Sequence, residues 1–217
     1  MTRQARLPLR RRIVLATLPA LAVAAGCSSI IPPAPEITSY QLSPKSTFPP
    51  NLPRVGGVLL IETPTAAPGL GSARIALVRQ ANQLEYYAGA DWVDVLPTLV
   101  RTRLVQSFDN SRAIDATSGR AAGPIPDYRL VVNIRHFEAV YGSLADGPDT
   151  WVALDVRLLG DRREMISRNT FEARVPVGDP RLGEIMLSFD EAFGSVAKDI
   201  VVWTMNEIAD RGRTARV

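Results

Sequence analysis

The chain contains a single cysteine and a single histidine among its 217 residues. The lone Cys27 excludes an internal disulfide and any zinc cluster built on cysteine ligands. His136 has no second histidine with which to share a metal. The sequence also lacks a Gly-x-Ser-x-Gly pattern around a nucleophilic serine. We therefore interpret His136 as structural, on the face of its strand that carries Ile134, and we predict no metal site and no catalytic residues.

Lysine is scarce, since it occurs only at positions 45 and 198. The five arginines of residues 1–26 account for the basic character of the full chain, because that segment carries no acidic residue. Without it, 20 basic residues stand against 22 acidic ones, a formal charge of −2. This balance does not support a basic surface for nucleic acid.

Long apolar runs are also missing. The longest, residues 13–27, follows three arginines and is shorter than the roughly 20 residues that span a bilayer. It ends in Ala24-Ala25-Gly26-Cys27, and small residues directly before a cysteine resemble a bacterial lipobox. We predict that residues 1–26 are a lipoprotein signal peptide and that Cys27 carries covalent lipid. Ordinary secretion with cleavage after Ala24 stays an alternative, because Ala22-Val23-Ala24 is also a cleavage pattern.

A proline-rich segment follows the cysteine. Pro32, Pro33 and Pro35 favour polyproline II over helix or strand. At roughly 3.1 Å per residue, nine such residues reach about 28 Å. We interpret residues 27–36 as the lipidated cysteine and a tether that holds a domain away from a membrane.

The rest of the chain alternates short strand patterns with two helical ones. We expect strands within residues 37–42, 55–63, 73–79, 82–87, 113–117, 128–141, 151–159 and 164–175. The predicted fold class is α+β: about seven strands in a largely antiparallel or mixed sheet, with two amphipathic helices packed on one face. We expect residues 37–212 to form the domain and residues 213–217 to form a disordered tail.

The first helix is expected from about Val95 to Asn110, with Asp91 or Asp94 as its N-cap. Its buried stripe recurs every four residues: Leu96, Val100, Leu104 and Phe108. The second helix is expected over residues 181–211, stopped by Gly212. Its inner face is expected to comprise Ile185, Phe189, Phe193, Val196 and Ile200, and to continue with Trp203 or with the neighbours Asn206 and Glu207.

These motifs occur in an order that resembles a known family. After the lipobox and tether come Tyr40-Gln41-Leu42, a hairpin closing on Glu85-Tyr86-Tyr87, Trp92, a Leu-rich helix, a meander from Tyr128 and a long helix containing Trp203. The order is similar to that of the ABC-type transport auxiliary lipoprotein family, which includes PqiC/YmbA-like outer-membrane lipoproteins. The resemblance covers nearly all of residues 27–212.

The resemblance implies a non-catalytic accessory on the periplasmic face of the outer membrane. It implies partnership with an MCE-domain protein and with the permease and ATPase of the same ABC system, moving lipids or other apolar molecules between the membranes. Ser28, directly after the lipidated cysteine, agrees with outer-membrane sorting. No cofactor is expected beyond the lipid on Cys27, and a homo-oligomer is left open.

The aromatic residues Tyr86, Tyr87 and Trp92 are the candidate partner-binding residues. Adjacent tyrosines on a strand face opposite sides, so one of the two is expected outside the core. The alternative is that the group anchors the hairpin to the first helix within the core. Two other functions also stay open: a periplasmic lipid-binding carrier and, less favoured, a secreted hydrolase.

Overall fold

The computed structural model describes residues 36–119, 123, 125–142 and 147–214. The predicted signal peptide, Cys27 and the tether up to residue 35 lie outside these residues. These residues form two helices and nine strands, and the strands make up one mixed sheet. The predicted α+β class is confirmed, with somewhat more strands than the sequence pattern indicated. No helix among the described residues is both long and apolar enough to cross a membrane.

A three-stranded meander forms the long part of the sheet. Strands β7 (Tyr128–Tyr141), β8 (Pro148–Gly160) and β9 (Met165–Pro176) pair antiparallel along their lengths. The bounds of β7 are those predicted from its alternating pattern. The meander therefore follows directly from the period of two in the sequence.

The other edge of β7 is shared by three short strands, each parallel to it. From one end to the other they are β2 (Val58–Ile61), β3 (Thr65–Ala66) and β4 (Arg74–Gln80). Strand β6 (Asp115–Thr117) pairs with β2. Strand β5 (Gln83–Trp92) pairs with β4, and β1 (Thr38–Tyr40) pairs with β5. Segments far apart in sequence thus meet on one strand.

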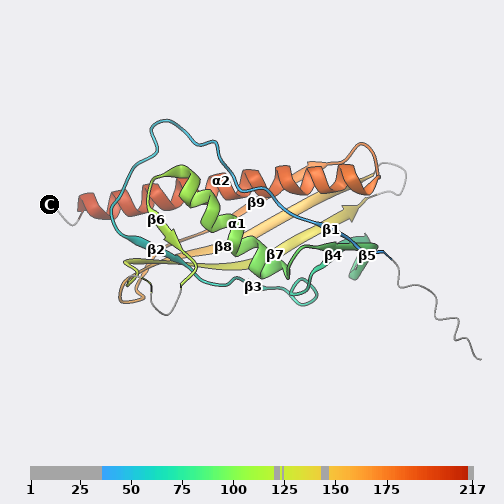
Figure 1. Cartoon of the computed structure of the whole chain (residues 1–217), viewed down its shortest axis with the longest axis horizontal. Helices are drawn as coiled ribbons and strands as arrows, with labels where there is room; N and C mark the ends of the chain where they lie inside the picture. The colour runs from blue at the N-terminus through green and yellow to red at the C-terminus, as the bar shows by residue number, and fades with distance from the viewer. Residues whose placement is uncertain (1–35, 120–122, 124, 143–146, 215–217) are drawn as a thin grey trace, which may run out of the picture. The chain divides into compact units, whose positions relative to one another are not determined.

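Helices α1 (Leu96–Ser111) and α2 (Leu182–Thr214) cover one face of the sheet. Figure 1 shows α2 running along β8 and β9, and α1 lies against α2, β2 and β6. Two contacts fix α2 there: the hydroxyls of Ser188 and Thr150 lie 2.7 Å apart, and the rings of Trp203 and Phe171 lie 5.5 Å apart. The opposite face of β7, β8 and β9 carries no helix among the described residues.

The core lies between the helices and the covered face. The predicted stripe of α1 is buried, and so is that of α2 from Ile185 to Ile200, with every member at 3% exposure or less. Trp203, which was also expected on the inner face of α2, is only half-buried. Aromatic rings fill the centre: Phe137 and Phe189 stack at 5.5 Å, and Trp92 meets them edge-on at 5.7 and 5.4 Å. Each such aromatic pair stabilises the folded state by roughly 0.5–1.5 kcal/mol in addition to the contribution of the buried area.

Several local predictions were wrong. Asp91 does not open a helix, because β5 continues through Trp92. The N-cap of α1 is Val95, which makes no side-chain cap, while Asp94 accepts the Val95 N–H at 2.7 Å. Gly212 does not stop α2, which reaches Thr214. Strand β3 lies outside the predicted strands, because its two residues are too few to show an alternating pattern.

A β-bulge in β7 changes which residues face the core. Ile134 pairs with Leu154, yet His136 pairs with Ala153, so Arg135 is an inserted residue. Beyond a bulge, the alternation of faces shifts by one residue. Phe137 consequently lies in the core and His136 on the open face, which corrects the prediction that His136 shares the face of Ile134.

Candidate functional site

Strand β5 carries the three aromatic residues predicted to bind a partner. Trp92 is only 3% exposed and packs among the core rings. Tyr86 and Tyr87 are half-buried. The structure therefore brings the three together on one strand but places Trp92 where a partner cannot reach it, which is the core arrangement left open by the sequence. Tyr86 and Tyr87 remain the proposed contact residues.

The two tyrosines make different contacts. The hydroxyl of Tyr86 donates to the carbonyl oxygen of Gly69 at 3.0 Å, and the guanidinium of Arg74 lies 3.6 Å above its ring. The hydroxyls of Tyr87 and Tyr141 lie 3.0 Å apart. Burial, together with this hydrogen bond, raises the pKa of Tyr87 well above its ordinary value. Tyr87 is therefore neutral, and these contacts hold the rings of Tyr86 and Tyr87 in place.

The open face of the sheet carries a second aromatic group, which the sequence reading missed. The ring of His136 stacks on that of Trp151 at 3.4 Å, and the guanidinium of Arg174 lies 3.8 Å over the other ring face. The Nδ1 atom of His136 lies 2.6 Å from Oε1 of Glu138, whose other oxygen accepts the Phe137 N–H at 2.5 Å. The stack spans β7, β8 and β9.

The contacts of His136 support a structural role for the ring. One nitrogen is held by a buried carboxylate, and one ring face is covered by indole. Among the residues that the structure describes, no group of three or more His, Cys, Asp or Glu side chains is placed to hold a metal ion. The bulge that turns His136 outward has no clear sequence signal, so the stack could not be anticipated.

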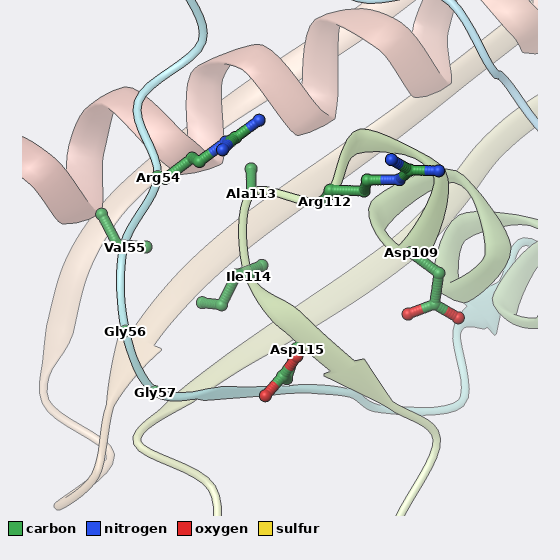
Figure 2. A pocket seen from close by; sticks show the side chains of 9 residues that line it. All are labelled: Arg54, Val55, Gly56, Gly57, Asp109, Arg112, Ala113, Ile114 and Asp115. Carbon is green, nitrogen blue, oxygen red and sulfur yellow. The ribbon is translucent and has the colours of Figure 1, made fainter.

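A hollow of about 550 Å³ lies between the segment before β2 and the end of α1. Its charged residues are Arg54, Asp109, Arg112 and Asp115. Figure 2 shows their charged groups pointing in different directions, with none of them converging on one point. Asp109 accepts a hydrogen bond from the backbone of Ala116, while its partial burial raises the pKa of its carboxyl. This arrangement joins α1 to β6 and shows no catalytic geometry.

The comparisons with known proteins identify the class. The model of the family described as ABC-type transport auxiliary lipoprotein component matches residues 40–201. That span is about three quarters of the chain, and the chain belongs to this family.

The individual relatives have low sequence identity to this chain. A crystal structure of a Xanthomonas campestris protein is similar at 26% identity and a TM-score of 0.73, covering 81% of this chain and 99% of that one. Another uncharacterized protein of known structure shares the fold at 15% identity and a TM-score of 0.61, covering 76% and 97%.

A curated relative, an uncharacterized protein of Bradyrhizobium diazoefficiens, is 26% identical over 174 residues. The match covers 80% of this chain and 46% of the relative. The chain thus spans about half the length of that protein.

Proposed function

We propose that this protein is the lipid-anchored periplasmic adaptor of an MCE-type ABC transport system that moves lipids or other apolar molecules between the inner and outer membranes. The observation that carries the proposal is the family match over residues 40–201. The role is non-catalytic, and the partners are the MCE-domain protein and the permease and ATPase of the same system.

The filled core favours an adaptor over a lipid carrier. A carrier needs an apolar cavity of a few hundred Å³ to hold an acyl chain. Between the helices and the sheet, Phe108, Phe137, Phe189 and Phe193 are fully buried and take up the space where such a chain would lie. The domain then acts through its surface, and half-buried Tyr86 and Tyr87 suit contact with a partner.

Crosslinking in intact cells tests the partnership. A photoreactive residue at position 86 or 87 should capture the MCE-domain protein. The matched control is position 92 on the same strand, where 3% exposure predicts no capture. If positions 86 and 87 stay silent, and positions across the rest of the surface also capture no transporter component, the adaptor proposal fails and the carrier becomes the better hypothesis.

Anchoring is a separate part of the proposal. Several acyl chains together hold a protein on a membrane far more firmly than one does. Labelling with radioactive palmitate should mark the wild type and not Cys27→Ser, which should also be unprocessed or mislocalised. An unlabelled wild type cut after Ala24 would show a secreted protein, and fractionation of labelled protein away from the outer membrane would contradict the location.

The absence of catalysis has its own test. His136→Gln keeps a polar side chain of similar volume and should leave transport intact. Loss of transport in a variant that is still folded and membrane-bound would show that His136 takes part in chemistry.

A further inference from the structure

Two arginines face each other on the open side of the sheet. Arg157 of β8 and Arg168 of β9 are directly opposite partners in the antiparallel ladder, and both are exposed. Side chains at such positions have Cβ atoms roughly 4.5–5.5 Å apart, and like charges there are destabilising. The repulsion between Arg157 and Arg168 therefore lowers the stability of the sheet at this place.

Neighbouring carboxylates do not offset the pair. Among the ion pairs of residues 36–119, 123, 125–142 and 147–214, none includes Arg157 or Arg168. The nearest acid along the strand, Asp155, is already engaged: one oxygen lies 3.4 Å from Nη1 of Arg135 and accepts the Thr170 hydroxyl at 2.7 Å. Two positive charges are therefore left in excess at this place.

The pair lines an open hollow of about 560 Å³. Arg135, Asp155, Asn133 and Thr170 line it too. The polar groups around the arginines are held in position, since Asn133 donates to the hydroxyl of Thr65 at 2.7 Å. The volume lies in the range of roughly 300–1,000 Å³ that is typical of sites for small molecules.

The excess of positive charge is confined to the end of the open face that carries Arg157 and Arg168. Farther along the same face, Arg174 lies over Trp151, and Glu138 is paired with His136. The chain from residue 27 onward is slightly acidic as a whole, with 22 acidic residues against 20 basic ones. General basicity thus does not account for Arg157 and Arg168.

We propose that this hollow binds a phosphate group between Arg157 and Arg168. Each guanidinium offers a planar fork that matches phosphate oxygens in a bidentate manner. A single carboxylate has two oxygens and is satisfied by one fork, whereas a tetrahedral phosphate presents oxygens to forks on two sides. The phosphate belongs either to a lipid headgroup or to a small soluble molecule, and the inference does not depend on the MCE partnership.

Calorimetric titration of the full chain in a nonionic detergent tests the site. The soluble probes are inorganic phosphate and glycerol phosphate. The lipid probe is dioctanoyl phosphatidylglycerol, compared with dioctanoylglycerol, which lacks the phosphate. Binding of either kind of phosphate probe supports the site, and the tighter of the two identifies the source. Arg157→Gln and Arg168→Gln should each weaken that binding about tenfold or more.

Arg162→Gln is the matched control, because it removes the same charge from the exposed turn of the same hairpin. It should leave the affinity within about twofold, since long-range attraction is screened by salt. A second readout is the unfolding temperature without ligand. Arg168→Gln should keep or raise that temperature, because it removes the repulsion, while phosphate no longer stabilises the variant.

Three results would overturn the proposal. The wild type binds none of the phosphate probes, Arg162→Gln loses as much affinity as Arg168→Gln, or acidic peptides without phosphate bind at Arg157 and Arg168 in place of the probes. Crosslinking at Tyr86 and Tyr87 is independent of these results, so failure of the phosphate site and failure of the adaptor role are distinguishable.

Discussion

The two faces of β8 differ in burial and in the kind of side chain that they carry. On the face under α2, Thr150, Val152, Leu154, Val156 and Leu158 are all at 1% exposure or less. On the other face, Trp151, Asp155 and Arg157 reach solvent. The covered face gains its free energy from apolar burial, while the open face is free to carry charges that cost stability.

The largest expected effect lies on the covered face. Phe189→Ala removes a fully buried ring that packs on Phe137 and Trp92. The free energy of unfolding should fall by about 3–5 kcal/mol, because a cavity adds to the lost burial. Urea unfolding followed by tryptophan fluorescence measures it.

The matched control is Leu187→Ala on the same helix, where the side chain is 65% exposed. Its change should stay within about 0.5 kcal/mol. Equal losses for the two variants would mean that helix propensity rather than core packing decides the stability of α2.

A smaller effect is expected from the aromatic stack on the open face. Trp151→Ala removes the ring that contacts His136 and Arg174. The loss should be about 1–2 kcal/mol, since stacking and cation–π contacts at partly exposed sites are modest. Trp151→Phe should recover part of it. A loss as large as that of Phe189→Ala would remove the distinction between the two faces.

The smallest effect is expected near the arginine pair. Asp155→Asn breaks an ion pair with Arg135 in which both side chains are about half exposed. The free energy of unfolding should fall by about 0.5 kcal/mol, and this loss should shrink in high salt, as for other exposed ion pairs. A larger, salt-independent loss would indicate that Asp155 is a packing residue.

The sequence predicted elements that depend on local periodicity. Alternation gave the bounds of β7, and the four-residue spacing of Leu96, Val100, Leu104 and Phe108 identified the buried stripe of α1. These signals are strong because one face of each element is apolar throughout. The predicted fold class and the predicted packing of both helices on one face of the sheet followed from these signals.

Non-local features could not be predicted in the same way. The bulge at Arg135 turns His136 outward, and no residue type in β7 announces it. The order of strands depends on which segments close on β7 in three dimensions. Arg157 and Arg168 lie opposite each other because of the register between β8 and β9, and the sequence alone does not reveal that register.

Tertiary contacts decide which of the candidate residues on β5 are buried. Sequence alternation indicated that Tyr86 and Tyr87 point apart, and it left open whether Trp92 is a core or a surface residue. The burial of Trp92 depends on Phe189, which lies 97 positions later in the chain. Composition near Trp92 carries no information about that contact.

The shared edge of β7 has a consequence for the order in which the chain folds. The pairings of β2, β3 and β4 with β7 each join residues more than sixty positions apart, whereas β7, β8 and β9 follow one another closely in the sequence. Closing long loops is slow, so we expect the meander to form first and the three parallel strands to dock later. Until they dock, one long edge of β7 stays unpaired, and an open edge is where two folding copies would pair by mistake.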